Sequence, residues 1–236
     1  MGRVRTYVGL GANIGSPAVG NGAKITNPAD SIAAAVHALA GLPGARLVGV
    51  SRLYATAPVG VSDQPEFRNA VAALDVPGGA DPTVEGLALL VALKELERAL
   101  GRRDGPRWGP RALDLDLLVF GGHAIHAKRP SGARSAHPDR AAAQWLTVPH
   151  ASARDRLFVL APLADLAPGL RPPGWGETVG TARRRAELRE GPASVRPMAV
   201  WDRATGSWRP ASPGIAANGG GGRGAGPASG GSGAGP

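Results

Sequence analysis

The chain has no cysteine among its 236 residues, which excludes disulfide bonds, thiolate metal sites and cysteine nucleophiles. Aromatic residues make up only 4% of the sequence, so a core drawn from the 43% of hydrophobic residues must consist mainly of Ala, Leu and Val. No apolar run reaches the roughly 18 residues that a membrane-spanning helix requires. We therefore expect a cytoplasmic protein without a membrane partner.

Basic residues exceed acidic ones, and the formal net charge is +9. Such an excess can mark nucleic-acid binding, so its location along the chain matters. Residues 183–236 contain eight arginines against three acidic residues, and residues 121–145 contain four basic residues against one acidic residue. Because the excess lies in segments that are least typical of a packed core, we predict no nucleic-acid partner.

The sequence divides into a domain over residues 1–182 and a tail over residues 183–236. From Asn218 to Pro236, ten of nineteen residues are glycine. Such a segment has little apolar surface whose burial could offset the entropy cost of ordering, so we predict a Gly/Arg-rich flexible C-terminal tail. Within the domain, residues 121–144 form a basic insertion whose purpose the sequence does not indicate.

Hydrophobic periodicity in the domain alternates between the patterns of strands and helices. The strand-like runs are Thr6–Leu10, Arg46–Tyr54, Phe67–Val76 and Ala112–Phe120. Two helices are expected from Asn27-Pro28 to Gly41 and from Asp81-Pro82 to Gly101. The order β-α-β-β-α-β predicts an α+β fold, the ferredoxin-like α/β sandwich, with an antiparallel sheet and helices on one face. A further short helix is expected over Arg154–Leu166.

The glycines after the first strand do not match a nucleotide-binding fingerprint. Gly9, Gly11 and Gly15 have the spacing G-x-G-x-x-x-G, which is one residue longer than the dinucleotide pattern. No Gly-Lys-Ser/Thr sequence follows, so a Walker A loop is excluded. The pattern predicts a turn after a strand.

Asp114 and Asp116 are the most informative acidic pair. At positions i and i+2 of a strand they share one face, with Cα atoms about 6.5–7 Å apart. Two carboxylates at this separation repel each other unless a cation lies between them, and Mg²⁺ suits the spacing. The alternative is a half-buried strand that shows its polar face to solvent.

Arginines crowd the approach to this strand. Arg102, Arg103, Arg107 and Arg111 fall within ten residues, and Trp108-Gly109-Pro110 stiffens the segment. Guanidinium groups beside paired acids are what a Mg–polyphosphate complex requires, because they bind the phosphate oxygens that the metal leaves free. A surface patch of salt bridges is the competing interpretation.

Several motifs resemble those of one enzyme family. LYATAPVG, DQPEFRNAV, RWGPRALDLDLLVF, LTVPH and RLFVLAPL occur in the family's order across about residues 5–180. They are similar to 6-hydroxymethyl-7,8-dihydropterin pyrophosphokinase, an enzyme of folate biosynthesis. The resemblance implies the ferredoxin-like fold, two Mg²⁺ ions, ATP as co-substrate and transfer of pyrophosphate from ATP to the pterin, with release of AMP.

The resemblance also implies a role for individual residues. Asp114 and Asp116 would bind the two Mg²⁺ ions, and Arg102, Arg103 and Arg111 would act in catalysis. The pterin pocket would consist of Thr56, Val59, Phe67, Asn69 and Phe158. The ATP site would consist of Glu97, Arg107, Trp108, Arg111, Leu117, Thr147, His150 and Arg156. The loop between Gly101 and Trp108 is one residue shorter than is usual in the family, which leaves open whether Arg102 or Arg103 is the catalytic loop arginine.

Two other functions remain compatible with the same fold. A ferredoxin-like sheet can bind RNA, but it then carries exposed aromatic residues on its central strands, and this chain has an aspartate-rich strand instead. An ordinary kinase would transfer one phosphoryl group and release ADP in place of AMP. For either enzyme the substrates are small molecules, and we expect a monomer.

Overall fold

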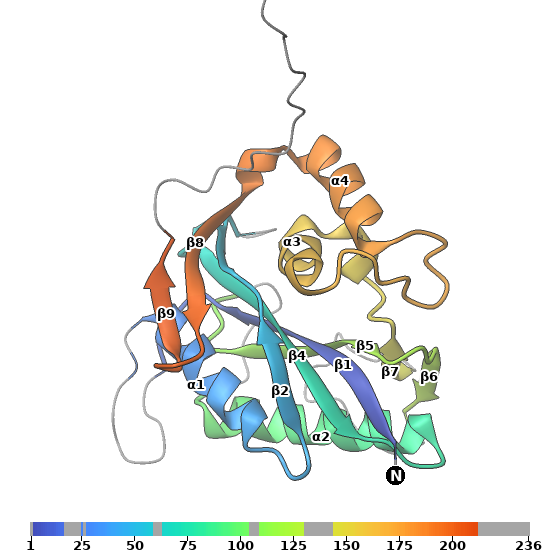
Figure 1. Cartoon of the computed structure of the whole chain (residues 1–236). Helices are drawn as coiled ribbons and strands as arrows, with labels where there is room; N and C mark the ends of the chain where they lie inside the picture. Colours follow the sequence, from blue (N-terminus) through green and yellow to red (C-terminus); the bar gives the residue numbers. More distant parts are fainter. Residues whose placement is uncertain are drawn as a thin grey trace, which may run out of the picture.

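The computed structural model describes residues 2–16, 25, 27–58, 63–103, 109–129 and 144–211. Its centre is a seven-stranded sheet in the order β5-β1-β4-β3-β8-β9, with β2 also paired to β4 (Figure 1). The strands of this sheet are β1 (Arg3–Ala12), β2 (Arg46–Val50), β3 (Leu53–Thr56), β4 (Phe67–Pro77), β5 (Asp114–Phe120), β8 (Val195–Asp202) and β9 (Ser207–Pro210). A two-stranded ribbon joins β6 (Ile125–Lys128) to β7 (Gln144–Val148). All of these pairings are antiparallel, as predicted.

The helices are α1 (Pro28–Ala40), α2 (Pro82–Ala99), α3 (Leu157–Leu166) and α4 (Val179–Glu190). The first two begin where the sequence predicts. Asn27 Oδ1 accepts from the Ala29 amide at 3.0 Å, and Asp81 Oδ1 accepts from the Thr83 amide at 2.8 Å. Each cap satisfies an amide that the first helical turn leaves without a partner, and the proline that follows needs no such partner.

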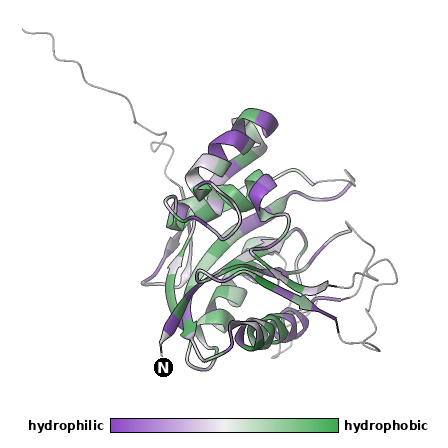
Figure 2. Cartoon of the chain, turned by 90° about the vertical axis from the view of Figure 1, so that its right-hand side faces the viewer, coloured by the Kyte–Doolittle hydropathy of each residue, from purple (hydrophilic) through white to green (hydrophobic). Residues whose placement is uncertain are grey.

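Both faces of the sheet are covered, whereas the sequence predicted helices on one face. Core residues of one face pack with α1 and α2, among them Leu10, Leu39 and Leu93. Tyr7 and Leu160 belong to the second core, on the side of α3 and α4. Figure 2 shows hydrophobic residues concentrated in the sheet between these helix layers.

Two irregularities alter the predicted strands. The run expected over Arg46–Tyr54 is two strands, because Ser51 Oγ accepts from the Val71 amide and replaces a backbone partner at the break. In β5, the register against β1 shifts next to Tyr7, so that Leu117 and Val119 lie in different cores although they are two residues apart on one strand.

The predicted flexible tail from residue 183 is wrong for residues 183–211. Residue 183 lies inside α4, β8 pairs with β3, and β9 extends the sheet beyond β8. Trp201 and Trp208 pack edge to face at 4.9 Å, and Trp208 Nε1 donates to Ala29 O of α1 at 3.2 Å. The segment orders because its amides complete the edge of the sheet and its tryptophans cover α1. Residues 212–236 lie outside the described residues.

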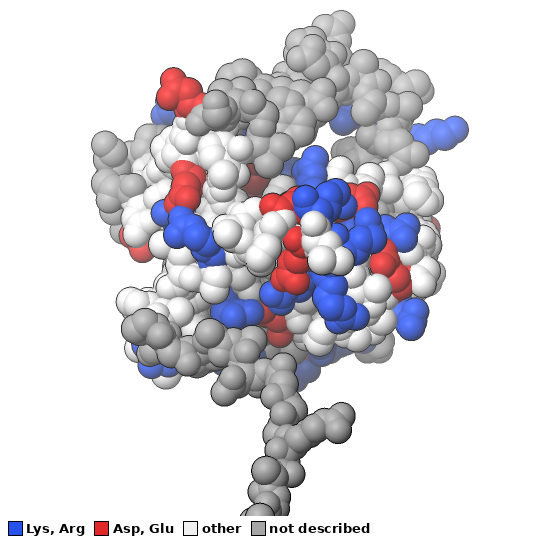
Figure 3. Space-filling model, turned by 90° about the horizontal axis from the view of Figure 1, so that it is seen from above, with Lys and Arg blue, Asp and Glu red and all other residues white. Residues whose placement is uncertain are grey.

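Basic residues of α4 lie beside acidic side chains that partly neutralise their charge. Arg183 pairs with Glu187 at 2.7 Å, and Arg185 lies 3.2 Å from Glu177. Seen from the α4 side, blue and red side chains alternate in Figure 3. The sequence placed this excess of positive charge in an unpacked tail, but here it lies on a packed helix beside acidic partners.

The predicted insertion at 121–144 contains ordered structure at both ends. Residues 125–128 and 144–148 form the β6–β7 ribbon, which packs against α2 at Gly86. A Cβ at Gly86 would lie 2.9 Å from Ile125 Cδ1, so the glycine allows the ribbon to approach the helix closely. Residues 130–143 lie outside the described residues.

A buried carboxylate joins three strands at the base of the sheet. Asp75 of β4 lies 2.6 Å from Arg5 Nε of β1 and 2.6 Å from Arg46 Nη2 of β2. Hydrogen bonds from Arg5 and then Arg46 lower the pKa of Asp75 to about 2. Because the folded pKa is depressed, the stabilisation is present above the ordinary value near 3.8 and is lost as the pH falls toward 2.

We therefore expect Asp75→Asn to lower the free energy of unfolding at pH 7 by about 1 kcal/mol, since both arginines are largely exposed and their charges are screened. Urea unfolding of both proteins at pH 7, 4 and 3 measures the difference. It should shrink at pH 3, and a loss of equal size at all three pH values would contradict the ion-pair explanation.

Candidate active site

A cavity of about 490 Å³ opens at one end of the sheet. Its walls come from strands β1, β3, β4 and β5, from α2 and α3, and from the segments before β5 and after β7. Ten of the residues predicted for catalysis or binding line it: Thr56, Phe67, Asn69, Arg102, Arg111, Asp114, Asp116, His150, Arg156 and Phe158. The structure thus brings together residues that are up to about 100 positions apart in the sequence.

Asp114 and Asp116 stand at the start of β5, on the side that faces the cavity. The residue between them, Leu115, is fully buried in the α1–α2 core, as strand alternation requires. Their partners across the ladder are Gly11 and Gly9 of β1. A Cβ at Gly11 would lie 3.3 Å from Asn69 Oδ1, and a Cβ at Gly9 would lie 3.3 Å from Leu118. The glycine cluster that the sequence read as a turn is therefore a bare stretch of strand in the cavity wall.

Three cations surround the acidic pair. Arg102 Nη1 lies 2.7 Å from Asp114 Oδ1, Arg111 Nε lies 3.6 Å from Asp114 Oδ2, and Lys94 Nζ lies 3.9 Å from Asp116 Oδ1. Burial raises the pKa of Asp114 to about 6; Arg102 opposes the rise, and the negative charges of Asp116 and Glu97 add to it. The acids thus belong to a charged cavity wall and not to an open polar strand face.

Glu97, which the resemblance placed in the ATP site, is only 1% exposed and lies behind β5. Its Oε1 accepts from Lys94 Nζ and from the Leu115 amide, each at 2.6 Å, and its Oε2 accepts from Arg102. The carboxylate therefore fixes the backbone between the two aspartates and one of the arginines.

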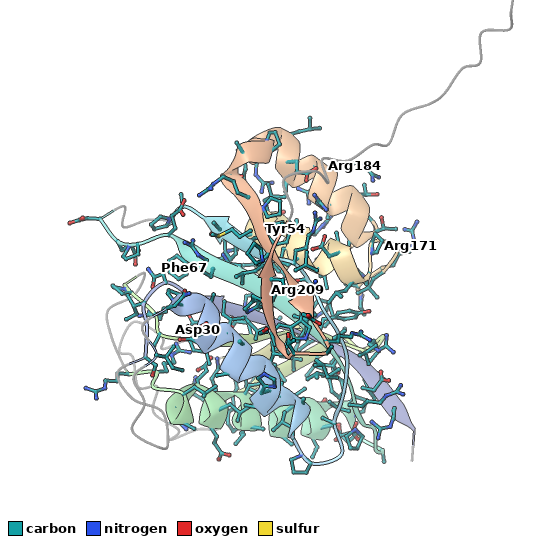
Figure 4. The ribbon with its side chains drawn as sticks, turned by 60° about the vertical axis from the view of Figure 1, so that its left-hand side comes forward. Asp30, Tyr54, Phe67, Arg171, Arg184 and Arg209 are labelled. Atoms are coloured by element: carbon teal, nitrogen blue, oxygen red, sulfur yellow. The ribbon has the colours of Figure 1, made fainter. Side chains whose placement is uncertain are left out.

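The residues predicted for the pterin pocket, as far as the structure describes them, come from two sides of the cavity. Asn69 Nδ2 donates to Thr56 Oγ1 at 2.8 Å, which joins β4 to the end of β3. Phe67 begins β4, well apart from Arg171 and Arg184 in Figure 4, and Phe158 lies on α3. The Arg156 guanidinium carbon lies 5.7 Å from the centre of the Phe158 ring. Val59 lies outside the described residues.

The other residues predicted for the ATP site are spread over several elements, and not all of them line the cavity. Thr147 lies on β7, paired with His126 of β6. The Leu117 side chain packs in the α1–α2 core, and it is its neighbour Leu118 that lines the cavity. Arg103 is exposed at the end of a described segment. Arg107 and Trp108 lie outside the described residues.

Lys94, which lines the cavity, and Asn13, which supports its wall, are among the residues that the sequence analysis missed. Lys94 sits three residues before Glu97 on α2, a helical spacing that could have linked them. Asn13 is buried after β1; its Oδ1 accepts from the Arg111 amide at 2.6 Å, and its Nδ2 donates to Gln64 Oε1 at 3.0 Å. Asn13 therefore couples the arginine segment to the segment that leads to Phe67, and no local pattern signals that contact.

The donor set suits a metal that arrives with its substrate. Within the described ranges, no group of three or more His, Cys, Asp or Glu side chains could enclose a metal ion. Mg²⁺ is commonly bound by one or two carboxylates plus phosphate oxygens and water, so Asp114 and Asp116 fit it. None of the helices in the described part of the chain has the length and apolar character needed to cross a bilayer.

Paired carboxylates and several cations in one cavity of an α+β fold are suited to an enzyme that acts on a polyphosphate. Residues 7–168 match the family model of 7,8-dihydro-6-hydroxymethylpterin-pyrophosphokinase. A 2-amino-4-hydroxy-6-hydroxymethyldihydropteridine pyrophosphokinase from Pseudomonas aeruginosa is 42% identical over 169 residues, covering 72% of this chain and 84% of the relative. The enzyme of the same name from Methylorubrum extorquens is 38% identical over 166 residues, covering 70% of this chain and 84% of the relative.

The chain belongs to the 6-hydroxymethyl-7,8-dihydropterin pyrophosphokinase family. Members of this family transfer pyrophosphate from ATP to the hydroxymethyl group of the reduced pterin in folate biosynthesis. The chain is accordingly an ATP-dependent diphosphokinase, and the predicted family and activity are confirmed.

Solved structures confirm the predicted fold. A crystal structure described as HPPK-DHPS in complex with substrates superposes with a TM-score of 0.62 at 12% identity, covering 89% of this chain and 50% of that chain. Wild-type HPPK-DHPS from Plasmodium falciparum gives a TM-score of 0.58 at 14% identity, covering 88% of this chain and 49% of that chain. This chain therefore spans about half the length of those proteins, and at such identities the likeness concerns the fold.

A neutral substitution of Asp114 can distinguish a role in catalysis from a role in folding stability. Because its folded pKa is raised to about 6, the ionised carboxylate disfavours folding at pH 7.5 relative to a neutral group. We expect Asp114→Asn to lower kcat at least a hundredfold while the metal-free Tm stays equal or rises. Steady-state assays and calorimetry measure the two quantities.

The matched control is Asp30→Asn, on the exposed first turn of α1 (Figure 4), which should leave kcat within about twofold of the wild-type value. A Tm several degrees lower in Asp114→Asn would show that the carboxylate is instead needed for stability.

Proposed function

We propose that this chain carries out its reaction in the cavity described above, with Asp114 and Asp116 holding two Mg²⁺ ions against the phosphates of ATP. The observation that carries the proposal is that one cavity is lined by two kinds of side chain, which we call its charged end and its apolar end. One end has paired carboxylates beside Lys94, Arg102 and Arg111, and the other has two phenylalanines and a buried amide.

The apolar end suits a flat heterocycle. Phe67 and Phe158 offer aromatic faces from different elements, and stacking on such faces favours a planar ring. The Asn69 amide is oriented by its bond to Thr56, which leaves its Oδ1 to accept a hydrogen bond from the edge of the pterin. Binding the pterin here would direct its hydroxymethyl group toward the charged end.

The charged end suits the transfer of an intact pyrophosphoryl group. Bound Mg²⁺ would neutralise phosphate oxygens and polarise the β-phosphorus that the pterin hydroxyl attacks. Arg102, Arg111 and Arg156 would bind the oxygens that remain, and AMP would leave on the side opposite the attacking oxygen. Phosphoryl transfer depends chiefly on positioning and electrostatics, so no strong base is required. Asp116, which is more exposed than Asp114, would be the carboxylate that assists removal of the hydroxyl proton.

His150 joins the cavity next to this end, and its amide donates to Leu118 O of β5 at 2.9 Å. We assign His150 and Thr147 to the adenosine side, where the resemblance places them. Arg102, which contacts Asp114, is the better candidate than Arg103 for the catalytic loop arginine. We further propose that the enzyme acts as a cytoplasmic monomer on small-molecule substrates.

Product analysis tests the reaction directly. Incubation of the purified protein with Mg–ATP and the reduced pterin should release AMP in equal amount to the pterin diphosphate, with no ADP. Release of ADP would mean transfer of a single phosphoryl group and would contradict the proposal. No turnover together with salt-sensitive RNA binding would favour a binding module instead.

The assignment of the pterin end is tested by Phe67→Ala. Loss of one stacking face should raise the KM for the pterin about tenfold, in line with the 0.5–1.5 kcal/mol of an aromatic pair plus lost burial. The KM for Mg–ATP should change by less than threefold. Phe67→Tyr, which keeps the ring, is the matched control, and equal effects on both KM values would place Phe67 elsewhere.

A further inference from the structure

The Arg102 side chain bridges two carboxylates that come from different elements. Its Nη1 lies 2.7 Å from Asp114 Oδ1 on β5 and donates as well to Glu97 Oε2 on α2. The side chain is only 16% exposed, so water screens the bridge weakly. One oxygen of a proposed metal ligand is therefore already bound by a positive charge of the protein itself.

The end of α2 holds Arg102 in this place. The Arg102 amide donates to Glu97 O at 2.9 Å, and the Gly101 amide donates to Arg98 O at 3.1 Å. These two bonds are the Schellman arrangement, in which Gly101 takes a φ of 92° that other residues rarely adopt. The helix end therefore fixes the backbone of Arg102, and the ion pairs with Glu97 and Asp114 hold its side chain.

Among the described residues that form ion pairs around the acidic pair, positive and negative charges balance before any metal enters. Three cations face three carboxylates: Lys94, Arg102 and Arg111 against Glu97, Asp114 and Asp116. A divalent ion alone would add two positive charges to this balanced cluster and would compete with Arg102 for Asp114. A divalent ion bound to a polyphosphate brings negative oxygens to which the displaced guanidinium can turn.

We propose that Arg102 is an internal counter-ion that occupies the metal-binding oxygen of Asp114 until a metal–nucleotide complex replaces it. Resting on the proposed function, this makes binding of the metal and of the nucleotide cooperative. The metal alone would have to displace Arg102 from Asp114, and the nucleotide alone would find Arg102 already paired with Asp114. Each ligand therefore lowers the free energy that binding of the other requires, and this coupling is reciprocal. Free Mg²⁺ then binds weakly, and the acidic pair is loaded only together with substrate.

The test measures metal binding without turnover. Mn²⁺ serves as the probe, and electron paramagnetic resonance reports the free ion in titrations of the nucleotide-free protein. Arg102→Gln removes the competing charge but keeps a group that can donate to Glu97. We expect this variant to bind Mn²⁺ about ten- to a hundredfold more tightly than the wild type, the range of one hydrogen bond between charged groups.

The same titration with α,β-methylene ATP present measures the coupling. In the wild type, the ATP analogue should tighten Mn²⁺ binding, and Mn²⁺ should tighten analogue binding by the same factor. In Arg102→Gln the factor should fall at least fivefold, because no guanidinium remains to be displaced.

The matched control is Arg98→Gln, which removes one positive charge from an exposed position on the last turn of α2. Its Mn²⁺ affinity should stay within threefold of the wild type, which separates a contact effect from a change in net charge. Arg102→Lys keeps the charge but loses the planar group that reaches both carboxylates, and it should tighten Mn²⁺ binding at least threefold.

Unchanged or weaker Mn²⁺ binding in a folded Arg102→Gln overturns the proposal, as does equal tightening in Arg98→Gln. If Arg102→Gln does not fold, Arg102→Lys decides, and the wild-type affinity in that variant overturns it. Because these titrations contain no pterin and no turnover, their outcome is independent of whether AMP is the product.

Discussion

The bond from the Leu115 amide to the buried carboxylate of Glu97 is the contact on which the site depends. It ties the last turns of α2 to the first residues of β5 at 2.6 Å. With the amide facing Glu97 and the Leu115 side chain in the core, alternation directs Asp114 and Asp116 to the cavity. The same carboxylate binds Lys94 and Arg102, so one side chain positions the backbone and two of the three cations. A buried acid of this kind is stable only while its partners are in place.

The second constraint is the absence of side chains on β1 at the two positions opposite the acids. β1 lies between β4 and β5, and its glycines oppose both aspartates. Without side chains there, Asn69 and Leu118 come close to the β1 backbone, and the cavity extends across three strands. Room for two substrates thus follows from the two positions of β1, Gly9 and Gly11, that carry no side chain opposite the acids.

The C-terminal part of the molecule shows where sequence reasoning failed. Caps and hydrophobic periodicity located α1, α2 and most strands, because those signals are local. Residues 195–211 were predicted to belong to a flexible tail because of the glycine-rich composition further along the chain. They order because β3 presents an unpaired edge and α1 a surface for Trp201 and Trp208. Neither partner can be recognised from the segment that binds it.

The sequence by itself determined most of the elements up to β5, the acidic pair and, through the collinear motifs, the family to which the chain belongs. It did so because caps, periodicity and motif residues are encoded within a few positions of one another. Only the tertiary structure decided that Glu97 supports the site from behind, that Lys94 and Asn13 belong to it, and that Leu117 faces the core. Those outcomes depend on contacts between distant segments and on one shift of strand register, which the order of residues along the chain does not reveal.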